Sequence, residues 1–496
     1  MIRKFEANYG VWILRYRWLV ILLMLIMVGL AASGGRFLSF TTNYRVFFSD
    51  DNPQLLAFEA LEKTYSKNDN VMLVITPKDG NVFTPKTLAV IQELTEKSWQ
   101  IPYSTRVDSI TNFQHTFAEV DDLIVQDLVL EPDSLNQQGL DQIRAIALSE
   151  PTLVNRLISP NAHTTGINVT IQLPGNDVTR ENPEVVHFVR KLADEMRQLY
   201  PDVDIRIVGM IMMNHAFTEA SQNDMMSVVP ISFLLMLVFL GILLRDVTST
   251  IGTLLVIIFS ILTALGLGGY IGYPITPPSA ATPNIVLTVA IANSVHILVT
   301  FLHEMRRGLP KNDAIIESLR VNLQPVFLAS FTTAIGFLSM NFSEVPPFMH
   351  LGNMVAIGVV ASFIFSVTFL PVFMSLLPVR VGAHEDRNDT PMLRFAEFVV
   401  MRRRLLFWGM TGTMIILVSF ITRNDLNDIF VHYFDEKIQF RQDVDYSSEN
   451  LSGMYVIEYS VESGEPGGIS NPGFLKDIAA FSEWYRQQPE VDHVNT

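Results

Sequence analysis

The chain of 496 residues contains no cysteine, carries a formal net charge of −15, and is 49% hydrophobic but only 17% charged. Soluble domains carry about 25% charged residues, so this composition excludes an ordinary soluble enzyme, and the lack of cysteine excludes a disulfide-stabilised fold. The negative charge argues against nucleic acid as a partner, because nucleic-acid-binding proteins present a basic face.

Seven apolar runs are each long enough to cross a bilayer, which takes about 20 residues of helix. None has Lys, Arg, Asp or Glu in its middle, unlike the amphipathic helices of soluble cores. The predicted spans are Trp18–Phe37, Met226–Leu244, Thr250–Ile271, Pro283–Leu302, Pro325–Phe342, Leu351–Leu377 and Leu405–Ile421. The first run has a cleaved signal peptide as its alternative, but its length favours an uncleaved span.

The segment between the first two spans has the alternation and helical periodicity of a soluble α+β domain. Strands are expected at Val71–Thr76, Thr105–Ile110, Gly166–Leu173 and Val203–Val208, and helices at Thr84–Trp99 and Asn182–Leu199. A polar, mostly helical stretch is expected at Gln114–Pro160 between the two halves. The order β-α-β, insert, β-α-β predicts a ferredoxin-like split βαβ domain.

The predicted fold class is therefore a polytopic α-helical membrane protein with an α+β domain outside the bilayer. Residues 1–40 hold the N-terminal segment and first span, 41–224 the first external domain, 225–380 spans two to six, 381–403 a linker, 404–422 the seventh span, and 423–496 the start of a second external domain.

The distribution of Lys and Arg predicts the orientation, because cytoplasmic loops collect these residues. Arginines and lysines precede the first span and fill the links between spans four and five and between spans six and seven, where Arg380 and Arg387 lie. The opposite loops, Gly272–Thr282 and Ser343–His350, contain none. The N-terminus is expected inside, and both large segments outside.

An internal repeat recurs after about 385–390 residues. The first copy consists of a basic stretch, a span and the motif Asn43-Tyr44-Arg45-Val46-Phe47-Phe48. The second copy consists of Arg402-Arg403-Arg404, a span and the motif Asn427-Asp428-Ile429-Phe430. The expected strand at Val71–Ile75 is matched at Met454–Tyr459, and Val107-Asp108-Ser109-Ile110 at Val491-Asp492-His493-Val494. Because the second copy stops there, the sequence predicts a natural protein with about twelve spans and two external domains, a known transporter design.

This layout resembles the resistance-nodulation-division (RND) superfamily, and local motifs resemble its MMPL-type hydrophobe and amphiphile exporters. The motif at 43–48 followed by Asn52-Pro53 resembles the stretch after their first span. Residues 289–298 resemble the fourth-span signature, with Asn293 where the family usually has Asp. Arg306-Arg307-Gly308 with a short amphipathic helix at Asp313–Arg320 resembles the cytoplasmic link, and 329–337 resembles the fifth span.

The resemblance implies proton-driven export of hydrophobic or amphiphilic molecules, including lipids, out of a bacterial inner membrane. Spans two to six also resemble a sterol-sensing domain, so a non-transporting binding or regulatory protein stays open, as does a protein or envelope assembly factor. Expected partners are membrane lipids and an amphiphilic substrate, with a periplasmic partner protein and homo-oligomerisation open. No enzyme activity, cofactor or metal site is predicted, since neither a phosphate loop nor the zinc spacing HExxH occurs.

The candidate site is a polar intramembrane cluster of Asn293, Ser294, His296, Thr332 and Thr333. His296 is the one ionisable side chain well inside a predicted span, a costly position that is usually functional, and imidazole exchanges protons near neutral pH. Asn293 stands three residues earlier and shares its helix face. The cluster is either a proton relay or a set of interhelical hydrogen bonds; Asn293 itself cannot carry a proton.

Overall fold

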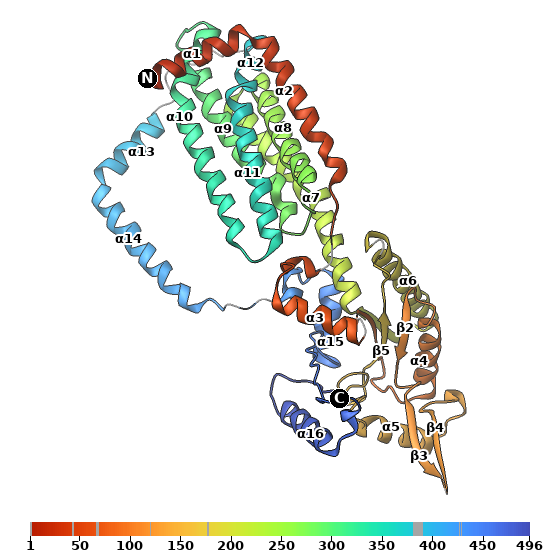
Figure 1. Cartoon of the computed structure of the whole chain (residues 1–496). Helices are drawn as coiled ribbons and strands as arrows, with labels where there is room; N and C mark the ends of the chain where they lie inside the picture. Colours follow the sequence, from red (N-terminus) through yellow and green to blue (C-terminus); the bar gives the residue numbers. More distant parts are fainter. Residues whose placement is uncertain are drawn as a thin grey trace. The chain divides into compact units, whose positions relative to one another are not determined.

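The computed structural model describes residues 2–41, 44–65, 69–119, 121–175, 178–379, 390–425, 427 and 429–496. The chain forms two compact units, shown in Figure 1. One consists of Met1–Ser39 with Asn223–Ile429, and the other of Phe40–Gln222 with Phe430–Thr496. Each unit is thus built from two stretches that lie far apart in the sequence.

The first unit is helical. Its helices are α1 (Ile2–Arg15), α2 (Arg17–Ala32), the later part of α7 (Met210–Leu244), α8 (Val247–Ile271), α9 (Thr282–Arg306), α10 (Lys311–Leu338), α11 (Pro346–Val367), α12 (Phe369–Leu376), α13 (Thr390–Met401) and α14 (Arg403–Ser419). Among the described residues, seven helical segments are long and apolar enough to cross a membrane, and each overlaps one of the seven predicted runs. The chain is therefore a multi-pass membrane protein.

The helix bounds correct the prediction in two places. A separate amphipathic helix at Asp313–Arg320 is wrong, because α10 runs unbroken from Lys311 to Leu338 with Pro325 inside it. A proline removes one backbone donor, and membrane helices tolerate this loss where neighbouring groups compensate. Similarly, α7 begins at Met210 rather than near Met226, because its polar first turns continue the helix out of the apolar run.

The sixth predicted span is broken into α11 and α12 at Thr368 (φ −113°). Pro371 has no N–H, so it cannot bond the carbonyl of Val367 four residues earlier, and its ring crowds that carbonyl. The hydroxyl of Tyr9 on α1 donates to the free Val367 oxygen at 3.4 Å. Burial raises the pKa of Tyr9 to about 12, so this hydroxyl keeps its proton over the physiological range.

Helices α2 and α8 approach so closely that their backbones touch through glycines. A Cβ added to Gly266 would lie 1.9 Å from the carbonyl oxygen of Ala31, and one on Gly34 would lie 2.1 Å from the oxygen of Gly266. A hydrogen bond of 2.6 Å joins the hydroxyls of Ser33 and Tyr270 beside this contact. Small residues allow this packing in membranes, where apolar burial alone gives little preference between helix and lipid.

The second unit contains α3 (Pro53–Thr64), β1 (Asn70–Pro77), α4 (Pro85–Ser98), β2 (Ser104–Asp108), β3 (Gln114–Glu119), β4 (Asp122–Asp127), α5 (Gln137–Ser149), β5 (Thr165–Ile171), α6 (Val178–Leu199), β6 (Val203–Val208), α15 (Gln439–Asn450) and α16 (Pro472–Arg486). Four strands form a sheet in the order β2-β5-β1-β6, and every neighbouring pair is antiparallel. Helix α4 starts as expected, with Pro85 in its first turn and Thr84 as its cap, accepting from the amide of Thr87 at 3.2 Å.

Helix α15, from the C-terminal stretch, packs against this sheet. The hydroxyl of Tyr446 donates to that of Thr76 on β1 at 3.0 Å, and Leu451 lies against Gly166 on β5. The buried carboxylate of Asp443 accepts from Arg206 and from the amide of Ile207, both at 3.4 Å. On β1, Thr76 and Val74 share this face, whereas the buried Val71, Leu73 and Ile75 point to the other face of the sheet.

Two expected elements of this unit are wrong. Gln114–Glu119 and Asp122–Asp127 form the antiparallel hairpin β3–β4 instead of helix, and Phe117 pairs with Ile124 across its ladder. No strand forms over Met454–Tyr459; this stretch is exposed, and no described strand pairs with it. A strand needs a partner for its backbone groups, which local alternation cannot supply.

Regular elements nevertheless recur in the order that the repeat predicts. Helix α2 with the short 3₁₀ helix Ser33–Phe37 is matched by α14 with Phe420–Arg423, α3 by α15, and α4 by α16, and both α4 and α16 begin at a proline. Of the predicted motif and linker residues, Asn43, Arg380, Arg387 and Asp428 lie outside the described residues.

Candidate functional site

Asn293 lies at the centre of the helical unit and is 3% exposed. Its amide nitrogen donates at 3.0 Å to the hydroxyl of Ser330 on α10 and at 3.0 Å to that of Ser362 on α11. The Ser330 hydroxyl also lies 3.3 Å from the amide oxygen of Asn293. One side chain of α9 thus connects three helices through hydrogen bonds in an otherwise apolar environment.

A second pair lies beside it. The hydroxyls of Ser294 on α9 and Ser366 on α11 are 3.4 Å apart, and both residues are fully buried. Ser362 and Ser366 are one helical turn apart, so they present one face to α9. We refer to Asn293, Ser294, Ser330, Ser362 and Ser366 as the central polar cluster.

The structure does not bring His296, Thr332 and Thr333 into this cluster. His296 is exposed, on the outer face of α9. The hydroxyls of Thr332 and Thr333 donate back to carbonyls of their own helix, Thr332 to Leu328 at 2.8 Å and Thr333 to Ala329 at 2.8 Å. The prediction that these side chains face Asn293 is wrong: Ser330 takes the buried position on α10, Thr332 is exposed, and Thr333 is only half-buried.

His296 belongs to an exposed stripe along α9 that also contains Thr288, Ala292, Val299 and His303. These residues recur at intervals of three or four, which places them on one side of the helix. Asn293 is close to His296 in sequence, but the buried and exposed rows of α9 separate the two side chains. The polar residues of the fourth span therefore serve two different faces.

A further polar contact ties α9 to α10. The amide of Asn322 donates to the hydroxyl of Thr300 at 2.8 Å, and the hydroxyl of Ser318 donates to the carbonyl of Ile297 at 2.6 Å. Together with the central polar cluster, these bonds form a series of hydrogen-bonded layers along the two helices. The contacts fix the rotation of α10 relative to α9.

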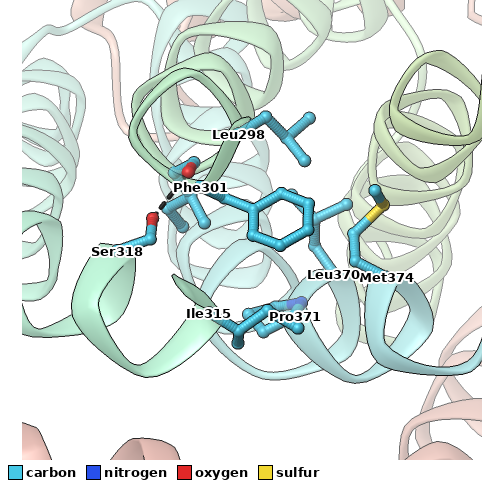
Figure 2. A pocket seen from close by; sticks show the side chains of 8 residues that line it. Leu298, Phe301, Ile315, Ser318, Leu370, Pro371 and Met374 are labelled. Carbon is cyan, nitrogen blue, oxygen red and sulfur yellow. Dashed lines mark hydrogen bonds between the residues drawn. The ribbon is translucent and has the colours of Figure 1, made fainter. Parts of the chain in front are cut away.

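Figure 2 shows a small apolar crevice near this contact. Its lining residues are Ile297, Leu298, Phe301, Ile315, Ser318, Leu370, Pro371 and Met374, from α9, α10 and α12. The Phe301 ring lies among the labelled aliphatic side chains, and the Ser318 hydroxyl is already bonded to a backbone carbonyl. The crevice therefore offers apolar contact without a free polar group to orient a ligand.

Sequence reasoning missed Ser330, Ser362 and Ser366. The sequence did contain a signal for two of these serines. Ser362 and Ser366 are one helical turn apart within an apolar span, just as the polar pair Asn293 and Ser294 lies within the fourth span. Polar side chains in a membrane helix face the bundle interior. Aligning the buried faces of the three spans would have selected Ser330 over the neighbouring threonines.

The central polar cluster consists of neutral hydrogen-bonding groups. It can hold α9, α10 and α11 in register, and its hydroxyls can orient a water molecule or a proton-bearing group. None of its five side chains gains or loses charge near neutral pH. Any change of charge in this part of the bundle must come from a neighbouring group, and His296 is the titratable residue of α9 nearest in sequence.

Comparison with known proteins identifies relatives. The chain is 20% identical over 383 residues to a protein of Methanocaldococcus jannaschii named as membrane protein MJ1562, a match that covers 76% of this chain and 92% of that protein. It is 24% identical over 324 residues to YdgH of Bacillus subtilis, also named as a membrane protein, covering 63% of this chain and 34% of YdgH. It is 22% identical over 326 residues to MmpL12 of Mycobacterium tuberculosis, named as a transport protein, covering 62% of this chain and 28% of MmpL12.

The chain thus matches nearly all of the archaeal relative but only about a third or less of YdgH and MmpL12. The MMPL family model matches residues 48–415, which include most of the second unit's sheet and all of the central polar cluster. This match extends over well more than half of the sequence. The chain belongs to the MMPL family.

Proposed function

We propose that this protein is a secondary active exporter of hydrophobic or amphiphilic molecules, lipids included, driven by the proton gradient. The observation that carries the proposal is the buried central polar cluster around Asn293. Polar groups are costly inside a membrane, and functional pathways are where they recur. The naming of MmpL12 as a transport protein supports the same class.

The proposed architecture is that of an RND-type half. The strand order β2-β5-β1-β6, with α4 and α6 connecting the outer strands to the inner ones, supports a ferredoxin-like domain. The division at residues 41–224 and 423–496 is proposed for the two external segments. Lys and Arg gather in the short links on one side of the spans, which supports a cytoplasmic N-terminus and periplasmic external domains in a bacterial inner membrane.

Within this exporter, His296 is the proposed proton carrier and the central polar cluster the element that senses it. Protonation of His296 places a charge on the outer stripe of α9, while Asn293, on the adjacent buried row, holds α9 to α10 and α11. A charged His296 prefers a more polar environment than a neutral one. This preference would act on α9, the helix that the central polar cluster holds to α10 and α11. The coupling is between two rows of one rigid helix, so no long pathway is required.

The proposal is tested by reconstituting the purified chain in proteoliposomes that contain a fluorescent amphiphile and imposing a pH gradient. Gradient-dependent flux that collapses with a protonophore is expected. His296→Gln should remove the gradient dependence, whereas the matched control His303→Gln, on the same stripe but at the end of α9, should retain it. Flux that ignores the gradient in all three proteins would contradict proton-driven export.

A second function, ligand binding without transport, is favoured by one specific observation. The central polar cluster contains Asn293 where the family resemblance implies an acid, so none of its five side chains has a charge to change. In this case the amphiphile would bind with measurable affinity, yet the imposed gradient would alter neither flux nor affinity. Equilibrium binding of the same fluorescent amphiphile, measured beside the flux assay, separates the two functions.

A further inference from the structure

Helices α1 and α2 meet in a fixed elbow at Tyr16, whose backbone (φ −104°, ψ 26°) leaves the helical region between Arg15 and Arg17. Backbone bonds continue on both sides, from the amide of Tyr16 to the carbonyl of Trp12 at 3.1 Å and from the amide of Val20 to the carbonyl of Tyr16 at 3.0 Å. The elbow therefore has a definite shape.

Helix α1 is also anchored to the bundle. A Cβ added at Gly10 would lie 3.3 Å from the Cα of Ile316, so α1 crosses α10 in close contact. Ile13 is fully buried in the same core, and Tyr9 holds the carbonyl beside Pro371. Side chains on the outer surface of α1 thus keep their positions relative to the start of α10.

Three positively charged side chains, Arg15, Arg17 and Lys311, lie at this elbow. Arg17 lies close enough to Lys311 for the two charges to interact, and the guanidinium of Arg15 lies 5.7 Å from the centre of the Tyr16 ring. The Lys311 ammonium donates to the carbonyls of Ser375, at 2.9 Å, and Leu377, which are neutral acceptors. Among the side chains that the structure describes, no carboxylate makes an ion pair with these three residues. Adjacent like charges repel, so the site favours an anion.

The surface around these charges is aromatic and then aliphatic. Trp12 is 53% exposed and its ring centre lies 5.7 Å from that of Tyr16, while Trp18 is 68% exposed. Trp and Tyr prefer the headgroup level of a bilayer. Exposed leucines continue along α2 from there: Leu19, Leu22 and Leu23. A phosphate at the cations would therefore have apolar surface below it for acyl chains, which a free phosphate would not use.

We propose that this elbow is a binding site for an anionic phospholipid, with the lipid phosphate at Arg17 and Lys311, the headgroup beside Trp12 and Tyr16, and an acyl chain along the leucines of α2. This site is separate from the central polar cluster and does not depend on export. Its consequence is that the lipid fixes the first helix pair against α10.

The test uses the full chain, with phosphatidylglycerol as the probe and phosphatidylcholine of the same acyl chains as reference. Native mass spectrometry after delipidation and titration counts the bound lipids. Wild type should retain phosphatidylglycerol in preference to phosphatidylcholine, and Arg17→Gln should weaken that retention about fivefold, the effect expected for one basic residue at a membrane surface. Arg17→Lys should restore most of it.

Arg306→Gln is the matched control, because Arg306 is an exposed arginine at the end of α9 with no ion pair among the described side chains. It should leave retention unchanged. Arg15→Gln provides a second variant if Arg17→Gln fails to fold by size-exclusion chromatography. Equal losses for Arg17→Gln and Arg306→Gln would overturn the proposal, since the attraction would then be general surface charge. Full displacement of the lipid by millimolar inorganic phosphate would overturn it as well, since the site would then take any phosphate.

Discussion

The hydrogen bonds of Asn293 make a quantitative prediction about stability. Replacing Asn293 with Ala removes its two 3.0 Å donor contacts to Ser330 and Ser362 and the acceptor contact at 3.3 Å. Interhelical hydrogen bonds in membranes average about 0.6 kcal/mol, with about 1.7 kcal/mol as the upper end. Two such bonds, with a small loss of packing, give an expected destabilisation of about 1–2 kcal/mol.

The pairwise energy is tested by a double-mutant cycle in mixed micelles, with unfolding driven by SDS. Asn293→Ala and Ser330→Ala should be coupled by about 0.6–1 kcal/mol, because the two side chains are in contact. The cycle of Asn293→Ala with Thr332→Ala is the matched control and should give no coupling, since the Thr332 hydroxyl bonds within its own helix. Coupling to Thr332 with none to Ser330 would refute the placement of the cluster.

Three further predictions follow from single contacts. Gly266→Ala should destabilise the chain by about 1–3 kcal/mol, the range for overpacking, because the new Cβ would lie 1.9 Å from the oxygen of Ala31. Thermal unfolding measures this loss, with Gly412→Ala as the control, because a Cβ at Gly412 meets nothing within 4 Å. Burial raises the pKa of Asp443, so the folded state binds this proton more tightly than the unfolded state. The stability that the proton contributes is present at low pH and lost as pH rises through the raised pKa. In Asp443→Asn the melting temperature should lose this dependence on pH, and an unchanged dependence would contradict the prediction. Tyr9→Phe should cost about 1 kcal/mol, because the carbonyl left open by the proline of α12 loses its donor; a melting temperature equal to that of wild type would show that water replaces the hydroxyl.

The spans were predictable because a long apolar run has one stable outcome in a bilayer, a helix with all backbone groups bonded internally. The ends of the spans were harder to predict from the sequence. The break at Thr368 depends on Pro371 together with Tyr9, which is remote in sequence, whereas Pro325 interrupts nothing.

The candidate site was predictable in part. Asn293 and Ser294 were identified from the fourth span itself, and both lie in the central polar cluster. Thr332 and Thr333 were chosen over Ser330 because composition does not give the rotation of a helix. Thr332, two residues from Ser330, is turned by about 200° to the other side of α10. Rotation is set by packing against α11, whose serines the local motifs did not indicate.

The second unit shows the same limit for strands. Alternation predicted β1, β5 and β6, which find partners within the described chain. A similar pattern at 454–459 has no partner strand in the described part of the chain and forms no strand. Pairing is a long-range property, so a local pattern can propose a strand but cannot supply its neighbour.

The most direct test of the proposed coupling role of the central polar cluster is gradient-driven flux in Asn293→Asp. The new carboxyl would be the first titratable group in the cluster, with the hydroxyls of Ser330 and Ser362 in place to bond it. In proteoliposomes under a series of imposed pH gradients, this account predicts a higher gradient-driven flux of the fluorescent amphiphile for Asn293→Asp than for wild type, with the gain reduced by adding Ser330→Ala. Equal flux for variant and wild type at every gradient, with both proteins folded, would contradict the proposed coupling role of the central polar cluster.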